Sequence, residues 1–181
     1  MGGLRFESLE ALFDAFPTAR SDIGGESEAA PVLESLQSFV EDKAWDKAVS
    51  LCAYLLPRRE AVWWGCKSLR RIQPQLAPAE IAVVEAAEAW VKEPEDDNRR
   101  QALKTGMLGD IRSAATWMAL AAGWSGGDLM PPEYGPTPAE PHQTARGVRA
   151  GLLIALAGVP SDSVATMIEP CIADAIELMR V

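Results

Sequence analysis

Apolar residues recur at intervals of three and four along most of this chain, which is the spacing of one buried face of an α-helix. The first stripe lies within residues 4–16 and consists of Phe6, Leu9, Leu12, Phe13 and Phe16. The same spacing predicts further helices over 31–43, 44–56, 58–72, 78–93, 98–105, 111–123 and 142–158, and a final helix from 164. No run alternates as a half-buried strand does, and no Asn-Gly hairpin occurs. The pattern therefore predicts an all-α fold, a single domain of seven to nine packed helices.

The segment 17–30 interrupts this pattern, because it holds a proline, two adjacent glycines and no apolar periodicity. We interpret it as a linker between an N-terminal amphipathic helix (1–16) and a helical domain (31–181). The first helix would then be loosely tethered, and it could dock on the domain, pair with a second copy of the chain or bind a partner. Tight connections favour antiparallel hairpins among the segments 31–43, 44–56 and 57–72.

Two neighbouring segments in the second half of the chain depart from the amphipathic pattern. From Ala114 onward the helix predicted over 111–123 is apolar nearly all round, which is typical of a central buried helix. The segment 124–141 that follows holds three glycines and five prolines and has no periodicity. Irregular segments of this length inside a domain are uncommon and often functional, so we treat 124–141 as a candidate binding loop.

Tryptophan is unusually frequent, with six residues of this type against four phenylalanines and two tyrosines. Trp63 and Trp64 are adjacent, so on a helix they point about 100° apart, and one core cannot easily bury both. If Val62 marks the buried stripe, Trp63 lies at its edge and Trp64 on the polar face. Either a second layer of helices covers Trp64, or Trp64 is an exposed binding anchor. Core positions account for Trp45, Trp90 and Trp117.

Three basic residues, Lys67, Arg70 and Arg71, follow the tryptophan pair at the end of the same predicted helix. Cations there complement the partial negative charge of a helix C-terminus, so the ordinary interpretation is a solvated helix end. The alternative is a contact with a phosphate or an acidic peptide, because the cluster is a small basic spot on an acidic chain.

Composition and charge narrow the classes of function. The chain has 181 residues, of which 48% are hydrophobic and 24% charged, and its net charge is -9. Such an acidic globular protein is a poor partner for nucleic acid or an anionic membrane. The longest apolar stretch, 150–159, is about half a membrane span, so we expect no membrane insertion and a cytoplasmic location. Three widely spaced cysteines suggest neither a disulfide framework nor a zinc site, and we expect no metal or cofactor.

One catalytic motif occurs in the chain. The run 123–127, Gly-Trp-Ser-Gly-Gly, matches the G-x-S-x-G nucleophile elbow, and Asp128 and His142 follow Ser125 in the order of a serine hydrolase. That chemistry requires the serine on a strand-to-helix turn, whereas here a helix is predicted before it. His142 is the sole histidine and stands at a predicted helix start, where the simpler role is to hold the loop or the helix cap.

Several segments together resemble a family of uncharacterised bacterial proteins. They are Pro-Arg-Arg-Glu-Ala-Val-Trp-Trp (57–64), Ala-Trp-Val (89–91), Trp-x-Ala-Leu-Ala-Ala-x-Trp-Ser-Gly-Gly (117–127) and Pro-His-x-Thr-Ala-Arg (141–146). The resemblance covers residues 45–158, and we associate the family with type VI secretion gene clusters. It implies an accessory or adaptor role and supplies no catalytic residues.

The sequence therefore supports three hypotheses. The first is a non-enzymatic bacterial protein-interaction module, which acts as an adaptor, chaperone or assembly accessory. Its predicted partner-binding residues are Arg59, Glu60, Trp64 and Arg71, with Trp124, Tyr134 and His142 of the loop region. The second is a small serine hydrolase that uses Ser125 and His142. The third is a homo-oligomer that associates through residues 4–16.

Overall fold

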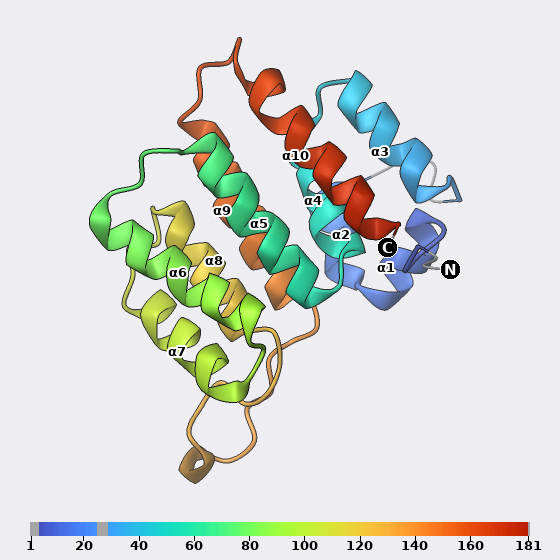
Figure 1. Ribbon diagram of the computed structural model, residues 1–181. Coiled ribbons are helices and arrows are strands. Elements are labelled where there is room, and N and C mark those ends of the chain that lie inside the picture. The colour runs from blue at the N-terminus through green and yellow to red at the C-terminus, as the bar shows by residue number, and fades with distance from the viewer. Residues whose placement is uncertain (1–3, 25–28, 181) are drawn as a thin grey trace.

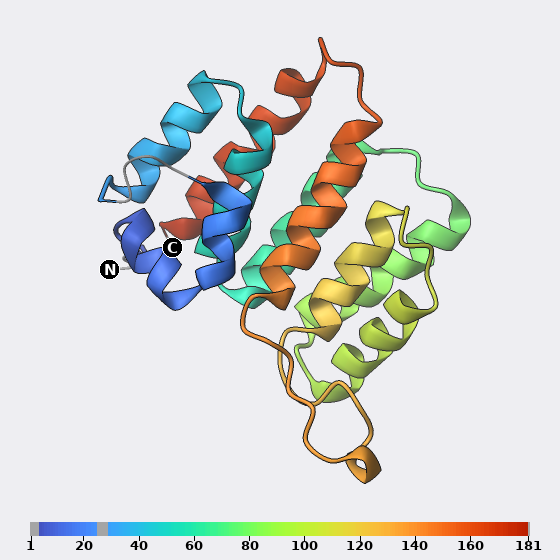
Figure 2. The ribbon, with the colours of Figure 1, turned by 180° about the vertical axis from the view of Figure 1, so that it is seen from behind.

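The computed structural model describes residues 4–24 and 29–180, and their regular structure is helical (Figures 1 and 2). The helices are α1 (Leu9–Ala15), α2 (Pro17–Ile23), α3 (Val32–Glu41), α4 (Trp45–Leu55), α5 (Arg58–Ile72), α6 (Pro78–Lys92), α7 (Asp96–Met107), α8 (Ala114–Gly123), η1 (Pro132–Tyr134, a 3-10 turn), α9 (Gln143–Ala157) and α10 (Val164–Met179). The described residues contain isolated β-bridges but no strand. The all-α prediction is confirmed, and the predicted number of helices is slightly low.

The additional helix is α2, which lies in the segment interpreted as a linker. Pro17 occupies its first turn, where a missing N–H costs nothing, and Ala19 and Ile23 bury one face four residues apart. The helix stops at Gly24, whose φ of 64° is accessible to glycine at little cost. The linker prediction is therefore wrong for residues 17–23, while residues 25–28 lie outside the described residues.

The N-terminal helix is docked on the rest of the chain. Three of its residues, Leu9, Leu12 and Phe13, and its C-cap residue Phe16 are buried in the same core cluster as the later helices. Ser8 caps α1 by accepting a hydrogen bond from the Ala11 amide at 3.2 Å, and the Val32 amide donates to the Glu7 carbonyl at 3.0 Å. The prediction of a loosely tethered helix is wrong, because the apolar face that motivated self-association is covered by this chain's own residues.

A half-buried carboxylate, that of Asp22, holds α2 against α4 and α9. Tyr54 donates a hydrogen bond to Asp22 at 2.7 Å, and Arg146 donates to both oxygens of Asp22 at 2.8 and 3.1 Å. Burial alone would raise the pKa of Asp22, but the hydrogen bonds from Arg146 and Tyr54 outweigh it, so the pKa lies below its ordinary value. Burial also raises the pKa of Tyr54 to about 12.

Replacing Asp22 with asparagine is expected to lower the free energy of unfolding by about 1–3 kcal/mol at neutral pH, because charged hydrogen bonds are lost in a half-buried place. A group with a lowered native pKa stabilises the fold above its unfolded pKa, and this contribution disappears as the pH falls through the native pKa. The deficit of the variant should therefore shrink below about pH 4. Urea titrations at several pH values measure it, with the exposed Asp14→Asn as control. An equal deficit at every pH would contradict the assignment.

The helix α8 lies at the centre of one half of the molecule, where it contacts α6, α7 and α9 (Figure 1). Nine of its ten residues are buried, which confirms the prediction of a central buried helix. Its last residue, Gly123, lies directly against the backbone of α7. A Cβ atom added there would come within 2.6 Å of Leu103 Cα and 2.9 Å of Leu103 N. The crossing of α7 and α8 therefore depends on a residue without a side chain.

Gly123→Ala is expected to lower the free energy of unfolding by about 1–3 kcal/mol, because the new methyl group meets backbone that cannot turn away. Gly126→Ala is the matched control, since nothing lies within 4 Å of its added Cβ. We expect that variant to be neutral or to stabilise by up to about 1 kcal/mol through the unfolded chain. Chemical denaturation of the two variants makes the comparison, and equal stability would show that the α7–α8 crossing can relax.

Candidate functional site: a groove beside Trp63

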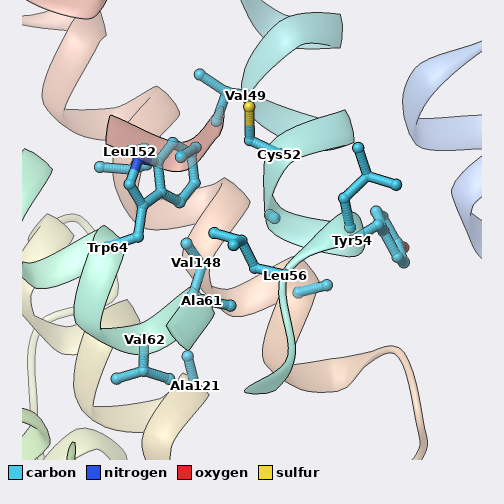
Figure 3. Packing of buried hydrophobic residues seen from close by; sticks show 14 of the residues in the cluster. Val49, Cys52, Tyr54, Leu56, Ala61, Val62, Trp64, Ala121, Val148 and Leu152 are labelled. Carbon is cyan, nitrogen blue, oxygen red and sulfur yellow. The ribbon is translucent and has the colours of Figure 1, made fainter. Parts of the chain in front are cut away.

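The two adjacent tryptophans occupy opposite environments. Trp64 is completely buried, and its indole Nε1 donates a hydrogen bond to the Cys171 carbonyl of α10 at 2.7 Å. Figure 3 shows its ring pointing inward among Val49 and Leu152. Trp63, in contrast, is 42% exposed. The prediction of Trp64 as a partner-binding residue is therefore wrong, and the alternative that a second helix layer covers it is confirmed.

Trp64 is buried and Trp63 exposed because several helices surround α5. It contacts α6, α8, α9 and α10; α9 lies behind it in Figure 1 and in front of it in Figure 2. Its buried surface therefore extends well beyond the stripe of Val62, Cys66 and Leu69. What remains exposed is a narrow edge of residues four apart, Arg59, Trp63 and Lys67.

This exposed edge borders a groove of about 900 Å³ between α5, α6 and the C-terminal end of α10. Its apolar lining comes from Pro57, Trp63, Cys66, Val91 and Leu178. Its charged lining comes from Arg59, Glu60, Lys67, Arg70, Glu88 and Lys92. The volume is in the range of ligand pockets, and the exposed tryptophan gives the groove a large apolar contact of the kind found at interfaces.

Ion pairs neutralise part of the charge around the groove. Arg70 donates hydrogen bonds to both carboxylate oxygens of Glu88 at 2.6 and 2.8 Å, and these bonds raise the pKa of Arg70. Lys67 and Arg71 both contact Asp174, at 3.1 and 2.9 Å. Burial would raise the pKa of Asp174, but hydrogen bonds from these two cations outweigh it and the pKa is lowered. The basic spot predicted at the end of α5 is thus joined to α6 and α10 rather than simply solvated.

The remaining cations of the groove are placed differently. The Arg59 guanidinium donates to the Val91 carbonyl at 2.7 Å, so it stabilises the C-terminus of α6. The Lys67 ammonium also lies over the Trp63 ring, 5.5 Å from its centroid. Lys92 is exposed, and no carboxylate of the described residues pairs with it. These three cations line the same groove as Trp63.

The structure does not bring the predicted partner-binding residues into one surface. Arg59 and Glu60 line the groove, whereas Arg71 lies beside it on Asp174. Trp124 is half-buried with its ring against Trp117, 6.3 Å between centroids. Tyr134 is 69% exposed in the loop, which Figures 1 and 2 show projecting beyond α7 and α8. None of the residues that line the groove comes from 124–141.

The loop 124–141 has an ordered base that the sequence did not reveal. Arg99 of α7 is only 4% exposed, and it donates to the Gly123 and Asp128 carbonyls at 2.9 and 3.1 Å. Its charge is balanced by Asp96, which accepts a hydrogen bond from the guanidinium at 2.8 Å. Between these carbonyls Gly127 has a φ of 61° and lies against the guanidinium. An arginine in a polar helix gives no sequence signal for such burial.

A second set of contacts closes the two arms of the loop. The Thr137 amide donates to the Asp128 carboxylate, and the Leu129 amide donates to the Thr137 carbonyl, both at 2.8 Å. Beyond this pairing the tip exposes Met130 and Tyr134. The loop is therefore irregular in sequence but fixed at its base.

The residues of the hydrolase alternative are engaged in loop structure. The Ser125 carbonyl accepts a hydrogen bond from Arg58 at 2.7 Å, and the Asp128 carboxylate is bonded to the Thr137 amide. Within the described residues no hydrogen bond joins Ser125 to His142, and Ser125 follows a helix instead of a strand. His142 is the N-cap residue of α9, but its side chain makes no cap hydrogen bond. The geometry contains no serine–histidine relay.

Exposed apolar residues also gather at the connection between α7 and α8. Met107, Leu108 and Ile111 are each more than half exposed, a feature the sequence analysis did not single out. The Ile111 carbonyl accepts a hydrogen bond from the Trp117 indole at 2.8 Å, which fixes the connection to α8. These residues provide exposed apolar positions outside the groove lining, useful as controls for Trp63.

Comparison with known proteins gives one family match. The model of a family of unknown function, DUF6931, matches residues 35–179. The chain belongs to this family. The DUF6931 match runs from α3 to the end of α10, so it includes every helix that lines the groove and the whole loop 124–141. The predicted resemblance to an uncharacterised family is confirmed. Neither a curated protein nor a solved structure gives a significant match.

Two further findings bear on the class of this DUF6931 chain. Over the residues that the structure describes, no helix is both long and apolar enough to cross a membrane. Over the same residues, no three histidine, cysteine, aspartate or glutamate side chains are grouped as metal ligands. The cysteines Cys52, Cys66 and Cys171 are buried and free, and burial raises the pKa of the Cys52 and Cys66 thiols.

Proposed function

We propose that this DUF6931 protein is a non-enzymatic protein-interaction module whose contact surface is the groove beside Trp63. The observation that supports this most directly is an exposed tryptophan at the edge of a 900 Å³ hollow, beside a tryptophan that is completely buried. Tryptophan, tyrosine and arginine are enriched among the residues that dominate binding energy at interfaces, where the contacts around them exclude water. The groove supplies both tryptophan and arginine, with Arg59 and Arg70 among its lining.

The finer form of the proposal is an adaptor, chaperone or assembly accessory in the bacterial cytoplasm. Its basis is the resemblance of the segments 57–64, 89–91 and 117–146 to proteins that we associate with type VI secretion gene clusters. A secretion-system component is accordingly the partner that we propose first. Catalysis receives less support, because the only histidine has no hydrogen bond to Ser125 and the cysteines are buried with inert thiols.

Site-specific photocrosslinking tests the proposal. A photoreactive phenylalanine analogue placed at Trp63 should crosslink a partner protein in the cells that make this chain. Matched positions at Leu108 and Tyr134, which are also exposed and apolar or aromatic, should not give the same product. Identification of the crosslinked protein by mass spectrometry then tests the secretion-system assignment. Crosslinks that are absent at position 63, or identical at all three positions, would overturn the groove as the contact surface.

A further inference from the structure

We infer that the groove beside Trp63 binds an amphipathic helix that carries acidic side chains, an inference that rests on the proposed function. The first argument is the shape of the surface. The groove lies between α5, α6 and the end of α10, and the described residues offer no strand edge to which an extended peptide could add. A hollow between packed helices accepts the ridge of another helix, as helix-in-groove recognition does elsewhere.

The second argument is charge. Four cationic side chains line the groove, Arg59, Lys67, Arg70 and Lys92, against the two carboxylates Glu60 and Glu88. The pairs described above do not remove this excess, because Lys67 and Arg71 share a single carboxylate and, among residues 4–24 and 29–180, none pairs with Lys92. The whole chain carries a net charge of -9. The surface beside Trp63 therefore has the opposite sign to the protein as a whole, which is electrostatic complementarity to an acidic partner.

The third argument is preorganisation of the binding groups. Arg59 is fixed by the Val91 carbonyl, Arg70 is fixed by Glu88, and the ammonium of Lys67 lies over the Trp63 ring. Side chains that are already ordered lose less entropy when a partner binds. An apolar side chain of the incoming helix would pack on Trp63 and Leu178, and its carboxylates would reach Lys92 and Lys67.

Three synthetic helical peptides of about 18 residues test the inference with the full chain. All carry one leucine stripe, and their polar positions are all glutamate, mixed glutamate and lysine, or all lysine. Fluorescence anisotropy at about 0.15 M salt measures their affinities. We expect the glutamate peptide to bind about tenfold or more tighter than the lysine peptide, although the protein is itself acidic. This order is the reverse of what the net charge alone would give.

Two variants connect the preference to the groove. Trp63→Ala should weaken binding of the glutamate peptide by about tenfold or more. Lys92→Glu should weaken the glutamate peptide and strengthen the lysine peptide. Tyr134→Ala, which removes a more exposed aromatic side chain on the loop, should change neither affinity. Circular dichroism and urea titration confirm that each variant is folded.

The outcomes separate this inference from the proposed function. Four results would each overturn the acidic-helix inference. They are tighter binding of the lysine peptide, equal binding of all three peptides, no binding, and binding of the glutamate peptide that Trp63→Ala does not weaken. A specific cellular crosslink at position 63 would leave the proposed function standing in those cases. Conversely, if the glutamate peptide behaves as expected but position 63 gives no cellular crosslink, the inference about the chemistry holds and the proposed function does not.

Discussion

Replacing Trp64 with alanine is expected to lower the free energy of unfolding by about 3–5 kcal/mol, which is a large part of the stability of a typical domain. The side chain is completely buried, so its removal leaves a cavity in the middle of the core. The Cys171 carbonyl also loses the hydrogen bond from the indole, and with it one connection between α5 and α10.

The adjacent Trp63 provides the matched comparison. Trp63→Ala removes the same side chain from the same helix, but from an exposed edge, and we expect it to change the free energy of unfolding by less than about 1 kcal/mol. Urea denaturation of the two variants, followed by circular dichroism so that the lost fluorescence does not matter, makes the measurement. Similar losses from both variants would contradict the assignment of one tryptophan to the core and the other to the groove.

Replacing Arg99 with methionine is expected to lower the free energy of unfolding by about 2–4 kcal/mol. Methionine fills much of the same space but donates no hydrogen bond, so the carbonyls of Gly123 and Asp128 lose their buried partner. The loop 124–141 should lose more order than the helices do. Hydrogen exchange of the Leu129 and Ala139 amides, which close the loop, reports this locally.

Arg100→Met is the control for Arg99. Arg100 is the next residue and also contacts Asp96, but its guanidinium is largely in solvent. Exposed ion pairs contribute little, so neither global stability nor exchange in the loop should change noticeably. If Arg99→Met loses global stability but hydrogen exchange of the Leu129 amide is unchanged, the loop is ordered without this arginine.

The order of helices follows from the sequence because most of them are long enough to show periodicity. The prediction of a linker over 17–30 was wrong at residues 17–23 for two reasons. Within α2 only Ala19 and Ile23 are buried apolar residues, too few for a stripe, and its stability comes from the hydrogen bonds of Asp22 with Tyr54 and Arg146. Those partners lie 32 and 124 residues away, so no local pattern contains them.

The candidate site could be predicted only in part, for a similar reason. The expectation that one core does not bury both tryptophans is confirmed, but the side that faces solvent depends on α10, whose Cys171 is 107 residues from Trp64. In the sequence, Lys67 and Arg71 indicate that this side of α5 is polar. In the structure both pair with Asp174 of α10, at the contact between α5 and α10. Arg59 and Glu60 were identified from the sequence, but the residues that α6 and α10 contribute to the groove were not.

Because the two indoles differ in exposure, tryptophan fluorescence can report on the groove without an added label. Iodide is an anion and caesium a cation, so they sample the charge around an exposed ring. Because cations outnumber carboxylates in the lining of the groove beside Trp63, iodide should quench its emission more than caesium does, although the net charge of the protein is -9. Trp64 should respond to neither until the chain unfolds. Because Trp45, Trp90, Trp117 and Trp124 also emit, the difference between the spectra of the unmodified protein and of Trp63→Phe isolates the signal of the groove, and the corresponding difference for Trp64→Phe isolates that of the core.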